Sequence, residues 1–294
     1  MAHVDETLSQ MLAPARQRSA IEWLAGWCSD RADVSSLSVG CSIGRGVADE
    51  LSDVDAAVGV MAPAGLRGRV AVEGVENALV ASLGEAGEVV DVLRDGSSWH
   101  ELVIRRVFVQ YADHLQLDLA VVAEEDVRRG DAAPDFITVY RAATAPPSVD
   151  PQPSAYAVSA EQLHEWAFRG WRALLDADKY LHRGSLWEAH ARLHEAREVI
   201  WQLWAAARGT SYPQHGLPQV LDDSPDDLPP HIEDTVAGLD AAELRDALTA
   251  ASTVLTRCAA ACAPRLSTEP PIAAYARTVL HHPVGAEGPS PQQS

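Results

Sequence analysis

Apolar positions in the first half of the chain recur mainly with the two-residue period of a β-strand. Two stretches instead place apolar residues three and four positions apart, which is the spacing of an amphipathic helix. Trp23 and Trp27 broaden the apolar stripe of the first of these helices, and we expect both indoles in the core. The pattern predicts helices over residues 15–28 and 70–83, and strands over residues 37–40, 53–60, 88–93, 106–112 and 115–122. Only Asp113 and His114 separate the last two strands, which predicts a hairpin turn there.

The second half of the chain changes to a helical period after a stretch rich in Pro and Ser. Ser185 and Glu188 have the spacing of a capping box, and Asp240 is the expected N-cap of a later helix. We predict helices over residues 163–181, 185–207 and 240–262, which together form a bundle. The expected fold is therefore α+β, with a mixed β-sheet domain and flanking helices followed by an α-helical bundle domain. The expected boundaries are 1–144 for the sheet domain, 145–160 for the linker, 161–282 for the bundle and 283–294 for a disordered tail.

Several polar or aromatic residues of the helical half are interpreted as structural. Cys258 and Cys262 both fall on an apolar stripe, so core packing is favoured over metal binding. His190 and His194 are four residues apart on a helix, but no third ligand accompanies them, which disfavours zinc. We interpret three tryptophans of this half as packing groups: Trp187, Trp201 and Trp204.

The composition narrows the class of protein and of ligand. The 294 residues are 47% hydrophobic, enough for packed cores in two domains, and no run of eighteen apolar residues predicts a membrane span. A net charge of −19 argues against nucleic acid as a partner and suits a cationic small molecule, although solubility alone also explains it. Four cysteines do not make a secreted disulfide framework, and the first residues lack the apolar segment of a signal peptide. We therefore expect a cytoplasmic protein that contacts neither membrane nor nucleic acid.

The most informative stretch is residues 39–60, which read VGCSIGRGVADELSDVDAAVGV. A strand here breaks into a turn of small residues that carries Ser42, and Asp53 and Asp55 follow on either side of Val54. Alternation along a strand places these two carboxylates on the same face. Carboxylate oxygens suit Mg²⁺, and a serine hydroxyl beside backbone N–H groups suits phosphate. The stretch therefore predicts a site for a divalent cation and a phosphate group.

A third carboxylate lies within an apolar strand. Asp118 is flanked by leucines in LQLDLAVV, and a lone buried carboxylate is costly unless it is paired or binds a metal. Alternation gives Asp118 the same face as Gln116 and Ala120, which leaves the leucines for the core. Asp91, in the preceding predicted strand, is the rival third acid, but its neighbours fit less well.

The sequence from Ser42 to Asp55 resembles the signature of the nucleotidyltransferase superfamily, which has the DNA polymerase β-like fold. In that signature Gly-Ser is followed after roughly ten residues by Asp-hydrophobic-Asp and an apolar run. Gly44-Arg45-Gly46 and Ser52-Asp53-Val54-Asp55 are similar to the antibiotic-modifying branch. One departure is Cys41, which stands where the family usually has Gly, so a turn that needs positive φ there would be strained.

The resemblance implies a role for each candidate residue. Asp53, Asp55 and Asp118 would hold Mg²⁺, and Asp118 would also be the catalytic base. Ser42 and Arg45 would bind the phosphates of a nucleoside triphosphate. The segment that contains Lys179 is similar to a helix end of the antibiotic nucleotidyltransferases whose lysine reaches the triphosphate.

The resemblance thus implies a Mg²⁺-dependent transferase that moves a nucleoside monophosphate, AMP from ATP being favoured, to a hydroxyl of a small molecule and releases pyrophosphate. An aminoglycoside or lincosamide antibiotic is the expected acceptor, with antibiotic resistance as the consequence, and the acceptor can be cationic. Two alternatives stay open: an antitoxin-like protein nucleotidylyltransferase that AMPylates a partner, and a nucleotide-binding protein of the same fold that has lost catalysis. Dimers are common in this branch, so both a monomer and a homodimer fit.

Overall fold

The computed structural model describes residues 12–99, 102–129, 135–147, 158–210, 212–266 and 268–281. Contacts divide the chain into two compact units, Met1–Ala155 and Tyr156–Ser294. The first unit contains a mixed sheet with helices and the second is helical, which confirms the α+β fold class. The predicted tail at 283–294 and most of the predicted linker lie outside the described residues.

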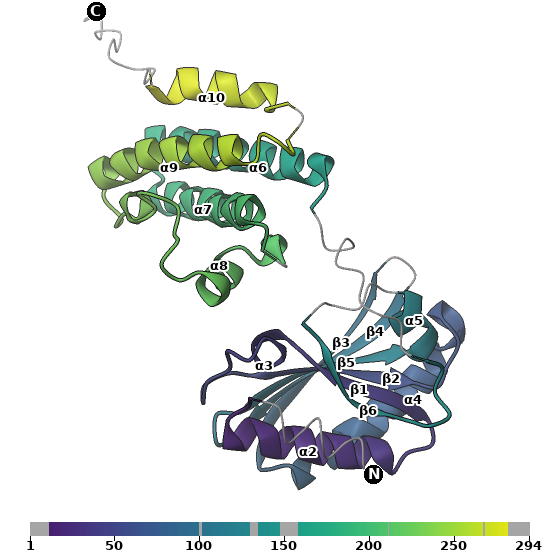
Figure 1. Cartoon of the computed structure of the whole chain (residues 1–294). Coiled ribbons are helices and arrows are strands. Elements are labelled where there is room, and N and C mark those ends of the chain that lie inside the picture. Colours follow the sequence, from purple (N-terminus) through teal and green to yellow (C-terminus); the bar gives the residue numbers. More distant parts are fainter. Residues whose placement is uncertain are drawn as a thin grey trace, which may run out of the picture. The chain divides into compact units, whose positions relative to one another are not determined.

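The first unit is built on a six-stranded sheet with the strand order β3-β4-β5-β2-β1-β6 (Figure 1). The pair β2–β5 is parallel and every other neighbouring pair is antiparallel. The strands are β1 (Val34–Val39), β2 (Val54–Val60), β3 (Val89–Trp99), β4 (Leu102–Tyr111), β5 (Gln116–Ala123) and β6 (Ile137–Arg141).

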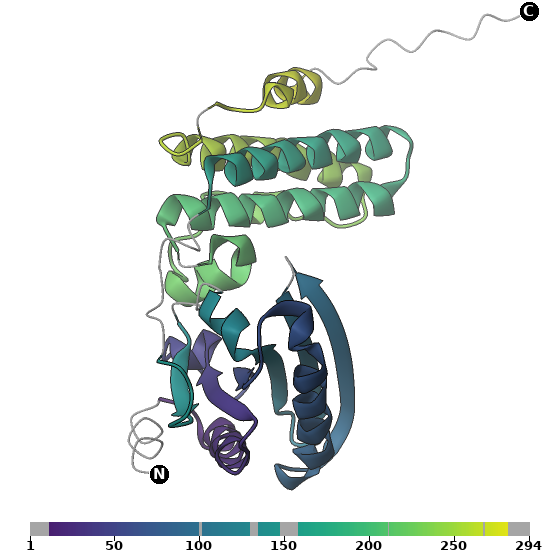
Figure 2. The same cartoon turned by 90° about the vertical axis from the view of Figure 1, so that its right-hand side faces the viewer.

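Two helices cover one face of this sheet, α2 (Ala15–Ser29) and α4 (Arg69–Ser82) (Figures 1 and 2). Their apolar stripes pack on every second residue of the central strands, among them Val58 of β2 and Leu119 of β5, and both of these side chains are fully buried. The apolar stripe predicted for residues 70–83 is confirmed. Shorter elements complete the unit: α3 (Cys41–Gly44), η1 (Gly65–Arg67), η2 (Leu83–Glu85) and α5 (Glu124–Arg129).

The hairpin β4–β5 was predicted from the sequence and is confirmed, with Gln110 paired to Gln116 across the turn and His114 at φ 72°. The strand β3 is longer than predicted. Its extension is tied down by Glu76 of α4, whose buried carboxylate accepts hydrogen bonds from Arg94 of β3 and Arg105 of β4 at 2.7 Å each. Hydrophobic periodicity does not reveal ion pairs such as these, so the extension of β3 was not predicted.

The tryptophans of α2 differ from the expectation. Trp23 and Trp27 pack against the core only from its rim and remain partly exposed. Their ring N–H groups bond to the end of the neighbouring helical segment, with Trp23 donating to Glu85 at 3.4 Å and Trp27 donating to Ser82 at 3.2 Å. An indole that must satisfy its N–H at a polar partner stays near the surface.

The second unit is an α-helical bundle in which α6, α7 and α9 pack against one another, as Figure 1 shows. Asp240 caps α9 by accepting from the N–H groups of Ala242 and Glu243, as predicted. The capping box predicted at Ser185 does not form, because the Ser185 hydroxyl donates to the Glu188 carboxylate instead of accepting from the backbone. The helices are α6 (Ala160–His182), α7 (Leu186–Arg208), α8 (Leu217–Asp223), α9 (Ala241–Ala261) and α10 (Pro271–His281), with η4 (Pro213–His215) and η5 (Glu233–Thr235) between them.

Side chains in the bundle mostly follow the sequence interpretation. Cys258 and Cys262 are buried, and so are Trp201 and Trp204. Trp187 is the exception, because 74% of it is exposed and it is not a packing group. In the part of the chain that the structure describes, every helix is too short or too polar to cross a lipid bilayer.

Candidate functional site

Two of the predicted carboxylates lie side by side on the sheet. Asp55 of β2 is the direct partner of Asp118 of β5 in the parallel ladder, so both side chains project from the same face. Their chain neighbours Val54 and Leu117 point to the helix-covered face and are buried. The carboxylates therefore lie on the face opposite α2 and α4. Asp53 directly precedes β2, and its charge acts on both Asp55 and Asp118.

A tight turn brings the backbone segment that contains Ser42 close to Asp55. The N–H of Gly40 donates to the carbonyl oxygen of Asp55 at 3.0 Å, and the single helical turn α3 follows at once. Ile43 anchors this turn in the core with 2% of its surface exposed. The turn after β1 and the start of β2 are therefore close in space, because the hydrogen bond from Gly40 to Asp55 joins them.

Gly40 and Gly44 are required by packing and not by φ. A Cβ on Gly40 would lie 2.2 Å from the ring of Phe136, and a Cβ on Gly44 would lie 1.7 Å from the carbonyl oxygen of Asp135. Cys41 is the residue with positive φ, at 54°. The strain that the sequence suggested at this position is therefore present, because an L-residue pays a steric cost in this region.

A cation that the sequence analysis did not single out lies among the acids. Arg106 of β4 donates from Nη2 to Asp118 Oδ2 at 3.2 Å, and its guanidinium carbon lies 5.4 Å from the ring centroid of Phe108. The register of the predicted hairpin could have placed Arg106 near Asp118. Counting back from the turn at Asp113 and His114 pairs Arg106 with Ala120, two residues from Asp118 and on the same face.

Burial and neighbouring negative charge raise the pKa values of Asp55 and Asp118. Burial raises the pKa of Asp55 to about 6, and the charges of Asp53 and Asp118 add to this, while the Cys41 thiol donates a hydrogen bond that acts in the opposite direction. Burial also raises the pKa of Asp118, against the influence of Arg106. The pKa of the Cys41 thiol is raised as well, first by burial and then by the Asp55 carboxylate. The cluster therefore has more negative charge than its own cations neutralise.

The side chains fit a divalent cation and a phosphate group in chemistry. Asp118 Oδ1 and Ser42 Oγ are both buried and have no hydrogen-bond partner, so each has an oxygen free for an added ligand. Carboxylate oxygens are the donors that Mg²⁺ prefers. Among the described residues, no three or more His, Cys, Asp or Glu side chains already converge in the geometry of a formed metal site.

Two predicted phosphate ligands have other contacts. Arg45 pairs with Asp135 at 2.8 Å, and both side chains are largely buried. Lys179 lies on α6 in the second unit, where it pairs with Asp176 and its Nζ lies 4.7 Å from the ring centroid of Tyr180. The structure thus groups Ser42, Asp53, Asp55 and Asp118. For Lys179 the role at the triphosphate stays a prediction.

The rival acid and one missed residue are also placed. Asp91 lies on β3, which β4 separates from β5, so Asp91 is not a neighbour of Asp118. Gln17 of α2 is buried and donates from Nε2 to three carbonyl oxygens of the loop before β2, the shortest bond being 2.8 Å to Ser52. Gln17 fixes the loop that carries Asp53. The sequence signal for this role was a polar residue, Gln17, within the apolar stripe of a helix.

The chain is similar to solved structures of low sequence identity. No protein-family description and no curated protein matches the sequence. Among solved structures, the chain is similar to an aminoglycoside 6-adenyltransferase from Bacillus subtilis, with 12% identity, a TM-score of 0.38, and coverage of 91% of this chain and 98% of the other. It is also similar to a nucleotidyltransferase-like protein from Exiguobacterium sibiricum 255-15, with 13% identity, a TM-score of 0.37, and coverage of 85% and 78%. Similarity at this level identifies no site residue.

Proposed function

We propose that this chain is a Mg²⁺-dependent nucleotidyltransferase that transfers a nucleoside monophosphate, AMP from ATP, to a hydroxyl group of a small molecule. One observation carries the proposal. Asp55 and Asp118 are direct partners on parallel strands, Asp53 precedes Asp55, and the turn that contains Ser42 is bonded to Asp55 through Gly40 and Cys41. Phosphoryl transfer requires positioned carboxylates for a divalent cation and hydroxyl or amide donors for the phosphates.

Asp53, Asp55 and Asp118 would hold Mg²⁺, which neutralises charge on the phosphates when it is bound. The Ser42 hydroxyl donates to an oxygen of the departing phosphates. Asp118 Oδ1, which has no hydrogen-bond partner, would accept the proton of the acceptor hydroxyl. The acceptor oxygen then forms a bond to the α-phosphorus, while the bond from the α-phosphorus to the β-phosphate oxygen breaks and pyrophosphate leaves.

The charge of the cluster supports a cationic acceptor. Within the described part of the chain, Arg106 is the guanidinium that acts on Asp55 and Asp118, against the charges of three carboxylates, and the full chain has a net charge of −19. A polyamine such as an aminoglycoside gains from this field more than a neutral acceptor does, because attraction in a partly buried site is less screened. An aminoglycoside is therefore the first acceptor to test, with a lincosamide as the less charged comparison. A protein hydroxyl is the third acceptor class.

The test is release of pyrophosphate with Mg²⁺ and each of ATP, GTP, CTP and UTP, against a panel of aminoglycosides and lincosamides. Release that requires an acceptor, and that falls at least about 1,000-fold in Asp53→Asn and Asp118→Asn, supports the proposal. Asp91→Asn is the matched control, since this acid is on the same sheet but away from the cluster, and it should keep full activity. Equal activity in Asp118→Asn and the parent would refute the proposed base.

A second candidate is a nucleotide-binding protein that no longer catalyses transfer. The strained Cys41 favours it, because its side chain lies at the turn and its thiol donates a hydrogen bond to Asp55, one of the proposed Mg²⁺ ligands. Under this candidate no acceptor gives turnover, yet Mg²⁺-ATP binds and Cys41→Gly restores activity. Absence of Mg²⁺-ATP binding from both the parent and Cys41→Gly would contradict both candidates.

A further inference from the structure

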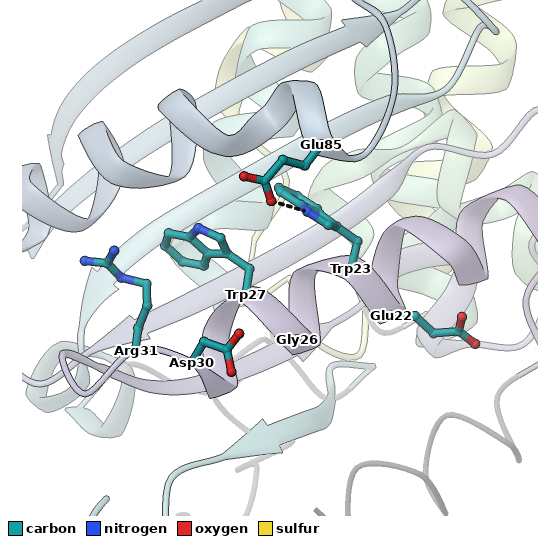
Figure 3. Close-up of a pocket in the computed structure, with 7 residues that line it drawn as sticks. All are labelled: Glu22, Trp23, Gly26, Trp27, Asp30, Arg31 and Glu85. Carbon is teal, nitrogen blue, oxygen red and sulfur yellow. Dashed lines mark hydrogen bonds between the residues drawn. The ribbon is translucent and has the colours of Figure 1, made fainter.

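A groove of about 440 Å³ lies on the outer side of α2, where Trp23 and Trp27 stand one helical turn apart. Figure 3 shows both indoles rising from α2, with Trp23 directed toward Glu85, Trp27 directed toward the side of Arg31, and Gly26 on the helix between them. The volume falls in the range of small-ligand sites. Both indoles are partly exposed beside this open space, so their rings are accessible to a ligand.

This groove is separate from the carboxylate cluster. The helix α2 packs on the face of the sheet that receives Val58 and Leu119. Asp55 and Asp118 project from the opposite face, with the sheet between them and the groove. A ligand in the groove therefore does not touch the proposed catalytic residues.

The charge of the groove favours a cation. Three carboxylates line it, those of Glu22, Asp30 and Glu85, against one guanidinium, that of Arg31. Asp33 already holds Arg31 with two hydrogen bonds, at 3.0 and 2.7 Å. The carboxylates are therefore left without a matching positive charge from the groove itself.

The aromatic surface also favours a cation. The guanidinium carbon of Arg31 lies 4.9 Å from the ring centroid of Trp27, which is the distance of a cation–π contact. The negative face of an indole attracts an ammonium group of a ligand in the same way, and tryptophan is the strongest such partner. Two indoles with acids at the rim make a site for a positive group that has an apolar coat.

Gly26 gives the groove its floor. A glycine inside a helix is costly, and here packing does not require it, because a Cβ at this position would meet no atom within 4 Å. The position faces open space between the two indoles. Leaving out a side chain there keeps the groove open for a ligand.

We propose that this groove binds a small organic ammonium ion, with its charge among the lining carboxylates of Glu22, Asp30 and Glu85 and its apolar coat against Trp23 and Trp27. The proposal is independent of the nucleotidyltransferase activity, since it involves the other face of the sheet.

The experiment is calorimetric titration of the full chain with choline and with 3,3-dimethylbutan-1-ol, its uncharged isostere. Choline should bind saturably and at least about fivefold more tightly than the alcohol, which is within the range of a cation–π contact. Gly26→Leu should abolish choline binding by filling the floor. Gly74→Leu is the matched control, because Gly74 is also an exposed helical glycine with no atom within 4 Å of a Cβ, and it lies outside the groove.

Arg31→Gln gives a test of sign. Removing a positive charge from the groove should tighten choline binding a few-fold, because choline is also positive. If the groove were instead a site for anions, the same substitution would weaken the binding of its ligand. Equal affinity for choline and the alcohol would overturn the proposal, and so would unchanged choline binding in Gly26→Leu. Absence of choline binding up to about 50 mM, far above a weak Kd of about 1 mM, would overturn it as well. Binding of lysine amide in preference to choline would also overturn it, in favour of a peptide partner.

Discussion

The thiol of Cys41 donates a hydrogen bond to the carboxylate of Asp55, so the turn that carries Ser42 is joined to the acid cluster by a side chain as well as by the backbone. The same residue has a φ of 54°, which glycine adopts freely and other residues avoid. Cys41 thus contributes a contact and a strain at one position. The balance between them can be measured by substitution.

Cys41→Gly should stabilise the chain. It removes the steric cost of positive φ, worth about 1 kcal/mol, and loses only a weak thiol hydrogen bond. The free energy of unfolding from urea titration should rise by roughly this amount. Cys41→Ala is the control, since it loses the thiol and keeps the strained Cβ, and it should be less stable than the parent. Equal losses in both variants would show that the thiol contact outweighs the strain.

Asp55→Asn should stabilise the chain in a pH-dependent way. Because the pKa of Asp55 is raised to about 6 in the folded state, the folded chain holds this proton more tightly than the unfolded chain. The parent therefore loses stability as pH rises from about 4 through 6, and the Asn variant does not. The gain should be small at pH 4 and roughly 3 kcal/mol at pH 7, the equivalent of the shift in pKa. Unfolding curves at several pH values check this, and a gain independent of pH would contradict the assigned pKa.

Arg106→Gln should strengthen the binding of a divalent cation to the nucleotide-free chain. The guanidinium competes with a cation for Asp118, so its removal leaves that carboxylate free. Mn²⁺ affinity by electron paramagnetic resonance should increase several-fold. Arg105→Gln is the matched control, because Arg105 is adjacent on β4 but bonds to Glu76 on the other face. That variant should lose stability without a change in Mn²⁺ affinity, and equal effects of the two would refute the competition.

Gly44→Ala should be strongly destabilising. The new methyl group would lie 1.7 Å from the backbone carbonyl oxygen of Asp135, which cannot move aside as a side chain end can. A loss of about 3 kcal/mol or more in the free energy of unfolding is expected. Gly74→Ala is the comparison in open space, and it should gain up to about 1 kcal/mol from helix propensity. A loss below about 1 kcal/mol in Gly44→Ala would mean that residue 135 does not pack here as described.

The strands and helices of the first unit were predictable where one face is buried. Leu117, Leu119 and Val121 alternate with polar or small residues, and the structure buries all three, so the face of Asp118 followed from the sequence. The strand β6 was missed because it is short and two of its residues are exposed. The burial of Glu76 was not predicted either. It depends on ion pairs with Arg94 and Arg105, which lie on other segments of the chain.

The sequence alone determined the α+β class, the hairpin β4–β5 and the candidates Ser42, Asp53, Asp55 and Asp118, because these depend on periodicity and on spacing within single segments. Only the tertiary structure decided that Asp55 and Asp118 are direct partners, that Arg106 pairs with Asp118, and that Trp23 and Trp27 border a groove. These are relations between segments far apart in the chain. They depend on strand order and packing, which one segment's hydrophobic pattern does not specify.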